Sequence, residues 1–263
     1  MTATRMPICL SPDHLYRPTN RPLAAERPVS ITYNGESYAV MMVSPQDLED
    51  FAVGFSISEG IVESKNEIVA ILDDEIDDGL LLHLEIIPDR LAALSERKRS
   101  LIGQTGCGLC GVTDLHEAVR TYTPIESAPH LSINSIFTSL QALPNQQILN
   151  QATGAVHAAA FADNKGTICA IREDVGRHNA FDKLIGDLAR TGIDPASGFA
   201  VLTSRCSIEL VQKALAFRIP ALITISAPTD LAVDVATDHS LTLVALARED
   251  GVICFNDPFG VFT

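Results

Sequence analysis

The sequence lacks any apolar run long enough to form a membrane-spanning helix. None of its apolar stretches approaches the roughly 20 residues that a bilayer requires. It also lacks internal repeats and low-complexity segments. Residues 1–25 are rich in Pro and Arg and contain no apolar stretch of signal-peptide length. With 46% apolar residues, these absences predict a globular cytoplasmic protein, without membrane contact, that begins with a flexible arm at residues 1–25.

Positive charge is scarce. The chain has 19 Lys and Arg against 33 Asp and Glu, a formal net charge of −14. General nucleic-acid binding needs a positive footprint, so the composition argues against it. An anionic ligand would instead need a local basic patch, and two stretches qualify. One is Arg97–Arg99, for which a solvated helix end is the simpler explanation; the other comprises Arg172, Arg177, His178, Lys183 and Arg205.

The six cysteines do not form the disulfide framework of a small secreted domain, because the chain is large and has no secretion signal. Cys169 and Cys254 lie in apolar runs and are predicted to be buried and inert. The pair Cys107-Gly-Leu-Cys110 is different, because Gly103–Gly111 holds four glycines in nine residues. Such a segment is predicted to be a mobile, exposed loop.

Two thiols at this spacing suit redox exchange, half of a zinc site or a persulfide relay, or they stand together by chance. A structural zinc site normally has a second Cys or His pair, and the sequence offers none at that spacing. A redox motif normally opens a helix without flanking glycines. An exposed, partly ionised thiol on a loop that can reach both a donor and an acceptor suits a persulfide carrier. We therefore favour sulfur handling and keep a zinc-binding or redox module as the alternative.

The remaining patterns predict two lobes. In the first, 26–125, a β-hairpin turns at Asn34-Gly35, and Ser44-Pro45 caps a helix that ends near Gly60. Two further strands and a helix that begins at Pro88 follow. In the second, 130–263, strands alternate with amphipathic helices, which indicates an α/β layer with parallel strand pairs.

Three polar loops follow strands of the second lobe. They begin at Asp174, at Thr203 and at Ser226, and the first carries Arg177 and His178 whereas the second carries Ser204 and Arg205. Loops at the carboxyl ends of parallel strands meet in one crevice, so a sizeable anionic ligand such as a nucleotide is expected there. Asp174 is ambiguous, because it suits a helix cap, an orienting carboxylate or a contact to a base.

His157 stands in an apolar segment where a helix is expected to begin. Zinc-dependent deaminases carry His-x-Glu in such a place, but Ala159 replaces the Glu, and no later Cys-x-x-Cys completes a metal site. A working nucleotide deaminase is therefore disfavoured, and no metal site is predicted.

Four motifs together resemble the FdhD/NarQ family, whose members are sulfur carriers required for formate dehydrogenase activity. They are Thr105-Gly-Cys-Gly-Leu-Cys-Gly111, Glu173-Asp-Val-Gly-Arg-His-Asn-Ala-Phe-Asp-Lys-Leu184, Ser204-Arg-Cys-Ser-Ile-Glu209 and Ser226-Ala-Pro-Thr229. The resemblance covers nearly all of the chain after the arm. It implies a cytidine deaminase-like three-layer core with a smaller N-terminal α+β lobe, and a homodimer.

The resemblance also implies a mechanism. A cysteine desulfurase loads sulfane sulfur onto Cys107, with Cys110 as a helper thiol. The sulfur passes to a bound molybdenum bis(molybdopterin guanine dinucleotide) cofactor, which is then delivered to formate dehydrogenase. The family's segment for this cofactor falls on Phe255, Asn256, Asp257, Pro258, Phe259 and Gly260. Many relatives have Arg where this chain has Asn256, so one contact differs.

Overall fold

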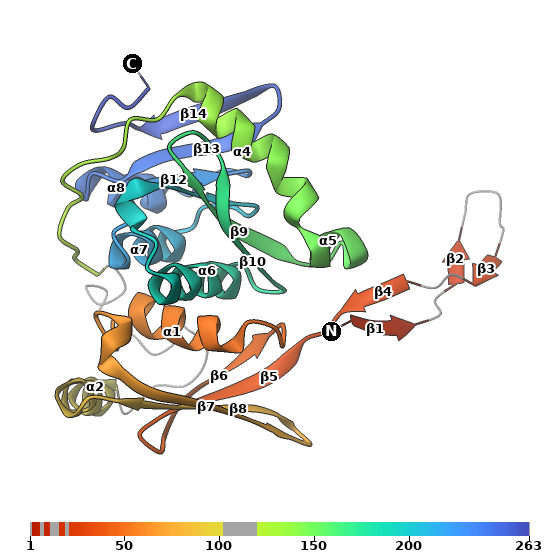
Figure 1. Cartoon of the computed structure of the whole chain (residues 1–263), viewed down its shortest axis with the longest axis vertical. Helices are drawn as coiled ribbons and strands as arrows, with labels where there is room; N and C mark the ends of the chain where they lie inside the picture. Colours follow the sequence, from red (N-terminus) through yellow and green to blue (C-terminus); the bar gives the residue numbers. More distant parts are fainter. Residues whose placement is uncertain (1, 6–7, 11–15, 19–20, 102–119, 263) are drawn as a thin grey trace.

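The structure is a computed structural model that describes the backbone of residues 2–5, 8–10, 16–18, 21–101 and 120–262, and the side chains of residues 21–94 and 120–262. Cys107, Cys110 and the side chains of Arg97–Arg99 lie outside these residues. Figure 1 shows two sheets separated by layers of helices. The chain is thus a mixed α/β protein, as predicted.

A six-stranded sheet forms the centre of the second half of the chain. Its order is β10-β9-β11-β12-β13-β14. The pairs β11–β12 and β12–β13 are parallel, as the alternating pattern predicts, whereas β9, β10 and β14 add antiparallel pairs at the two sides. The strands are β9 (His157–Asp163), β10 (Ile168–Asp174), β11 (Gly198–Leu202), β12 (Ala221–Thr224), β13 (Thr242–Arg248) and β14 (Gly251–Asn256).

Helices cover both faces of this sheet, because its central strands are apolar on both sides. On one face Phe161 and Leu202 pack against α6 and α7, and on the other Phe199 and Val201 pack against α4. This gives three layers, α4 on one side and α6, α7 and α8 on the other (Figure 1). The helices of this half are α4 (Ile133–Gln146), α5 (Ile148–Thr153), α6 (Arg177–Thr191), α7 (Ile208–Ala216) and α8 (Asp230–Asp238).

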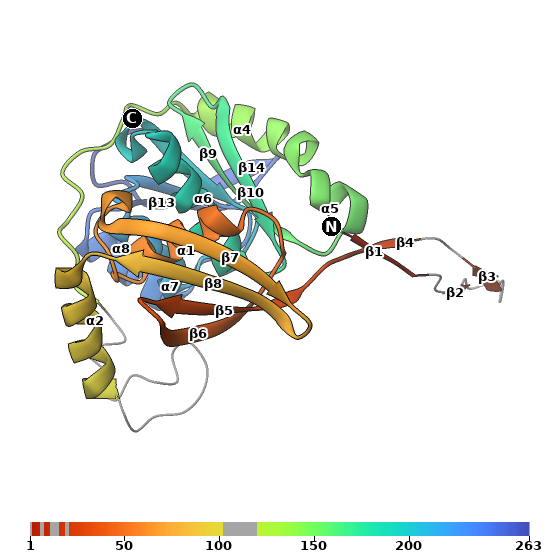
Figure 2. The same cartoon turned by 60° about the horizontal axis from the view of Figure 1, so that its bottom comes forward.

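The first half forms a four-stranded sheet of order β6-β5-β8-β7, which packs one face on α1. Val29, Ile31 and Tyr33 alternate with more exposed residues along β5, which is the pattern of a half-buried strand. α2 lies at one end of this sheet (Figure 2). The elements are β5 (Arg27–Tyr33), β6 (Glu36–Val43), α1 (Leu48–Ser58), β7 (Ile68–Ile76), β8 (Gly79–Ile86) and α2 (Pro88–Leu101).

The two halves meet where α1 crosses α6. A Cβ atom on Gly54 would lie 1.7 Å from the carbonyl oxygen of Asp182, and one on Gly186 would lie 1.8 Å from that of Asp50. Real Cβ atoms never approach oxygen so closely, so only glycine allows these backbones to touch. Phe51 and Phe55 of α1 and Phe181 of α6 belong to one buried apolar cluster, which joins the halves in one core.

Two local predictions differ from the structure. Ser44-Pro45 does not cap α1, which begins at Leu48 after Asp47. Ser44 instead forms hydrogen bonds with Asp174 of β10, with Val175 and with Lys183 of α6. His157 begins a strand, because the Ala-rich stretch after it fits between two sheet neighbours. Residues 1–25, whose flexibility stays a prediction, contain the short strands β1 (Thr2–Arg5), β2 (Ile8–Leu10), β3 (Tyr16–Pro18) and β4 (Arg21–Ala24).

Candidate functional site

The predicted strand-end loops lie together on the side of the six-stranded sheet where the parallel strands β11 and β12 have their carboxyl ends. We call this side the carboxyl edge. Ser226 N donates to the carbonyl of Ser204 (3.3 Å), and Thr229 N donates to that of Cys206 (2.9 Å). β10 also ends at this edge, because Asp174 pairs with His157 at the start of β9. The structure therefore brings the three loops to one edge.

The carboxylate of Asp174 makes several contacts within the chain. Its side chain is fully buried and forms an ion pair with Lys183 (2.7 Å), which is also fully buried. The same carboxylate accepts hydrogen bonds from Ser44 N (2.8 Å), Gly176 N (2.8 Å) and Asn179 Nδ2 (3.0 Å). Both oxygens of this carboxylate are engaged within the chain, and the cofactor contact at Asp174 stays a prediction. The carboxylate fixes the start of α6 and ties it to the β6–α1 loop.

Arg177 and His178 occupy the first turn of α6 and are half-buried. Burial, and then the charge of Arg177, lower the pKa of His178 to about 4, so this imidazole is neutral at neutral pH. The same two causes lower the pKa of His157. Arg177 thus lies within electrostatic reach of both histidines, and the three side chains form one polar group at this edge.

The second loop carries one buried and one exposed residue of the predicted site. Ser204 is buried, and its hydroxyl donates to the carbonyl of Arg205 (3.0 Å), whereas the Arg205 side chain is exposed. Cys206 is fully buried, and burial raises its pKa to about 12, so it is a core thiol. The expectation for Cys169 and Cys254 was wrong, because both are exposed on the outer strands β10 and β14.

The segment Phe255–Gly260 lies at the opposite edge of the sheet. Asn256 pairs with Leu243 near the start of β13, and the start of β13 pairs with the start of β12. Asn256 Nδ2 donates to the carbonyls of Leu241 (2.8 Å) and Ala236 (3.2 Å), so this amide closes the loop after α8. The sequence patterns did not reveal this separation.

The rest of this segment forms a turn. The carboxylate of Asp257 accepts hydrogen bonds from Val261 N (2.9 Å) and Phe262 N (3.4 Å). Gly260 has φ +59°, which suits a turn glycine, and Phe259 is half-buried against both cores. Asn256 and Asp257 are therefore engaged within the chain, and Phe255 is exposed.

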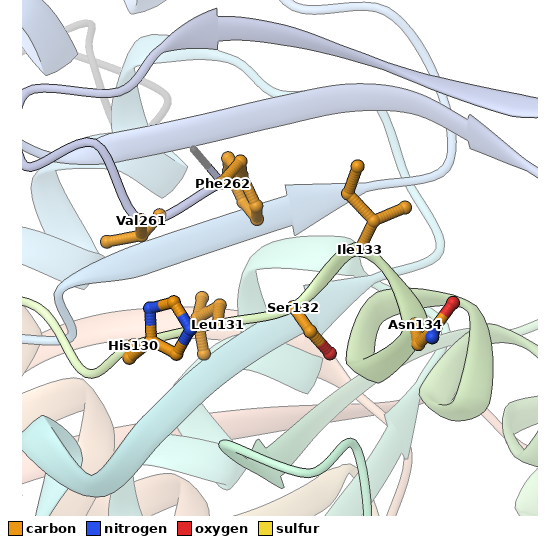
Figure 3. Close-up of a pocket in the computed structure, with 7 residues that line it drawn as sticks. All are labelled: His130, Leu131, Ser132, Ile133, Asn134, Val261 and Phe262. Atoms are coloured by element: carbon orange, nitrogen blue, oxygen red, sulfur yellow. The ribbon is translucent and has the colours of Figure 1, made fainter.

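A shallow groove of about 260 Å³ lies beside this turn (Figure 3). Val261 and Phe262 form one wall, and the start of α4 forms the other, where Ser132 caps the helix by accepting a hydrogen bond from Ser135 N (3.0 Å). Its lining residues are His130, Leu131, Ser132, Ile133, Asn134, Val261 and Phe262.

Arg120 is the first described residue after the stretch that carries Cys107 and Cys110, and hydrogen bonds fix its side chain to the end of α1. Arg120 donates to Glu59 Oε2 (2.7 Å) and to the carbonyl of Ser58 (3.2 Å). Lys213, almost fully buried, joins Glu59 (3.4 Å) to Asp182 (2.8 Å). This network between α1, α6 and α7 was missed, because its partners are far apart in the sequence.

Within the described residues, no group of three or more His, Cys, Asp and Glu side chains is placed to hold a metal ion. In the same part of the chain, no helix is long and apolar enough to cross a membrane.

Comparisons with known proteins agree with the fold and with the motifs. Residues 24–261 match the FdhD/NarQ family. A protein of Xanthomonas campestris pv. campestris (strain B100), named sulfur carrier protein FdhD, is 47% identical over 236 residues, which are 90% of this chain and 84% of the relative. One of the same name from Variovorax paradoxus (strain S110) is 42% identical over 237 residues, 90% of this chain and 85% of the relative.

A solved structure has the same fold. It is a protein of Desulfotalea psychrophila described as a formate dehydrogenase accessory protein, and it matches with a TM-score of 0.77 and 23% identity. The match covers 100% of this chain and 99% of the other. On the extent of the family match and the identity to its relatives, this chain belongs to the FdhD/NarQ family.

Proposed function

We propose that this chain is a sulfur carrier that accepts sulfane sulfur on Cys107 and delivers it to a molybdenum bis(molybdopterin guanine dinucleotide) cofactor for formate dehydrogenase. The observation that carries the proposal is the family match over residues 24–261, which includes the Cys107-Gly-Leu-Cys110 pair. The relatives of 42% and 47% identity are named sulfur carriers, and the structural neighbour is described as a formate dehydrogenase accessory protein.

The loading step is thiol exchange. The thiolate of Cys107 attacks the outer sulfur of the persulfide on a cysteine desulfurase, a new S–S bond forms at Cys107, and the desulfurase cysteine leaves as a thiolate. No net oxidation occurs. Cys110 serves as the helper thiol. This step would make the chain a sulfurtransferase. We further propose that it acts in the cytoplasm as a homodimer and that the core of its second half is cytidine deaminase-like.

The cofactor is a substrate of this reaction. At the carboxyl edge, Arg177 and the exposed Arg205 suit its phosphates, because guanidinium groups bind phosphate oxygens in pairs. At the opposite edge, Phe255 and the groove beside Val261 offer apolar surface for a ring. Asp174, Ser204, Asn256 and Asp257 support the two regions through internal hydrogen bonds.

The proposal is tested in cells that lack their own copy of the gene. Cys107→Ala should abolish formate dehydrogenase activity, because Cys107 forms the persulfide. Cys110→Ala should only lower this activity, because Cys110 is the helper thiol. Cys254→Ala is the matched control and should leave the activity unchanged, because that thiol is exposed on β14. Full activity with Cys107→Ala would refute the assignment.

A further inference from the structure

Four charged side chains of alternating sign form one series of ion pairs that joins the end of α1, α6, α7 and the segment that begins at Arg120. Arg120 Nη2 lies 2.7 Å from Glu59 Oε2, and Lys213 Nζ lies 3.4 Å from Glu59 Oε1. Each oxygen of the Glu59 carboxylate thus binds a different cation. Lys213 also pairs with Asp182 (2.8 Å), whose carboxylate accepts a hydrogen bond from the Ser58 hydroxyl (2.6 Å). Glu59 therefore links the half-buried arginine to an ion pair inside the core.

Stability alone does not account for such a network. Taking charges out of water costs several kcal/mol per ion, and a buried ion pair is often no more stabilising than well-packed apolar side chains of similar size. Lys213 is 6% exposed and Asp182 is 1% exposed, so both carry this cost. A buried and hydrogen-bonded network instead holds the segments that it joins in one defined arrangement. The segments joined here therefore indicate its role.

One of them is the chain directly after the stretch that carries the two cysteines. Two further contacts fix this chain. Tyr122 N donates to His239 Nε2 (3.1 Å), and Ile125 N donates to the carbonyl of His239 (2.9 Å). The rings of Tyr122 and His239 also meet edge to face, with 6.0 Å between their centroids. The chain that leaves the cysteine stretch is thus held by Arg120 at the end of α1 and by His239 at the end of α8.

The other segments are the two helices that begin at the carboxyl edge. Asp182 lies in α6 and Lys213 in α7. The network also reaches this edge electrostatically. Burial is the largest cause that lowers the pKa of His178 to about 4, and Lys213 adds to this shift, whereas Glu59 opposes it. The chain after the cysteine stretch and the carboxyl edge are therefore joined through Glu59 and Lys213.

We propose that Arg120 is a positioning residue for sulfur delivery. Bound to Glu59, it holds the chain after the cysteine pair in a fixed position relative to the carboxyl edge. The proposal rests on the proposed sulfur carrier, and it adds a residue that places the loaded thiol with respect to the acceptor.

The consequence differs between the two steps of the proposed reaction. Delivery breaks the S–S bond of the persulfide, returns Cys107 as a thiolate and passes the terminal sulfur to the acceptor, whose reduced molybdenum supplies the two electrons that make this sulfur sulfide. A displacement of about 1 Å can slow such a step about a hundredfold. Loading involves a desulfurase that approaches from solution, so it does not depend on the distance to the carboxyl edge. Loss of the Arg120 contacts should therefore slow delivery and spare loading.

The test measures loading and delivery separately in the full-length protein. A cysteine desulfurase loads Cys107 with radiolabelled sulfur, and peptide mass spectrometry of a parallel sample measures the loading. Delivery is the label recovered with formate dehydrogenase in an extract of cells that lack their own copy of the gene. Arg120→Gln should load as the wild-type protein does and deliver about ten- to a hundred-fold more slowly. Arg120→Lys should be intermediate, because one ammonium group replaces the two guanidinium nitrogens that bind Glu59 and the carbonyl of Ser58.

Arg27→Gln is the matched control. The Arg27 side chain is 36% exposed, against 31% for Arg120, and it also pairs with one glutamate, Glu75 (3.1 Å). It should load and deliver like the wild-type protein. Wild-type delivery by Arg120→Gln would overturn the proposal. So would an equal loss of loading and delivery, which is the result that a purely structural role predicts.

Hydrogen exchange provides an arm without sulfur chemistry. The amides of Tyr122 and Ile125 should exchange faster in Arg120→Gln than in the wild-type protein, because Arg120 no longer holds this chain. Unchanged exchange would overturn the proposal. Absence of sulfur on Cys107 of the wild-type protein would refute the sulfur carrier, and the exchange rates would still decide whether Arg120 fixes the chain.

Discussion

At the scale of single residues, the ion pair of Asp174 and Lys183 shows how a motif residue can serve the fold. Lys183 Nζ also donates to the carbonyl of Ser44 (2.9 Å), so the pair joins α6 to the loop before α1. The motif Glu173–Leu184 suggested a ligand site at Asp174, but its carboxylate makes only internal contacts among the described residues.

Replacing Lys183 should destabilise the protein, because Asp174 would lose its ion-pair partner. We expect Lys183→Met to lower the free energy of unfolding by about 3–5 kcal/mol, because the carboxylate of Asp174 would remain buried and unpaired. Urea unfolding measures the loss. Lys165→Met, at an exposed position, is the control and should change stability little. A loss at Lys183 no larger than at Lys165 would contradict this role.

The low pKa of His178 predicts a dependence of stability on pH. The folded state holds this pKa at about 4 against an ordinary value of 6.5, so the unfolded chain binds the proton first as the pH falls. Neutral His178 therefore contributes to the free energy of unfolding above pH 6.5. This contribution, of about 1–3 kcal/mol, is lost as the pH falls from 6.5 to 4. The drop between pH 7 and 5 should be smaller in His178→Gln than in the wild-type protein, whereas the exposed His130→Gln should keep it.

The described cysteines should differ in reactivity. Iodoacetamide should modify Cys169 readily and Cys254 more slowly, because partial burial and then Asp257 raise the pKa of Cys254. Cys206 should stay unmodified until the protein unfolds, because its side chain is fully buried. Peptide mass spectrometry after a short exposure reports each site. Modification of Cys206 in the folded protein would show that the edge of the sheet opens.

At the scale of elements, local patterns predicted much of the fold. The turn at Asn34-Gly35 was predicted correctly, and both residues have the positive φ angles, 49° and 84°, that a tight hairpin turn needs. Predictions failed where a partner far along the chain decides the structure. Ser44 forms hydrogen bonds with residues of β10 and α6 and therefore does not cap α1. His157 starts a strand because β9 pairs with β10 and β11 on its two sides.

The crossing of α1 and α6 depends on two glycines that no local pattern identifies. Gly54→Ala should destabilise the protein by about 1–3 kcal/mol or more, because its Cβ would meet the backbone of Asp182. Thermal unfolding measures the loss. Gly251→Ala is the matched control, because a Cβ there meets no atom within 4 Å. If Gly54→Ala left the stability unchanged, α1 and α6 could move apart without loss of stability, which would contradict this account.

At the scale of the whole molecule, the sequence predicted the convergence of three loops but not the distance of Phe255–Gly260 from them. The edge at which a strand ends depends on its direction in the sheet, and β14 runs antiparallel to β13, which no local pattern specifies. Likewise, the network of Arg120, Glu59 and Lys213 could not be assembled in advance, since Lys213 belongs to a helix far along the chain.

The central claim is that Cys107 carries the sulfur, and persulfide loading tests it most directly. The full-length protein is incubated with a cysteine desulfurase and cysteine, digested without reductant, and analysed by peptide mass spectrometry. We expect one added sulfur atom on Cys107, retained in Cys110→Ala and absent in Cys107→Ala. Sulfur found only on Cys110 or on another cysteine, or on none, would contradict the account.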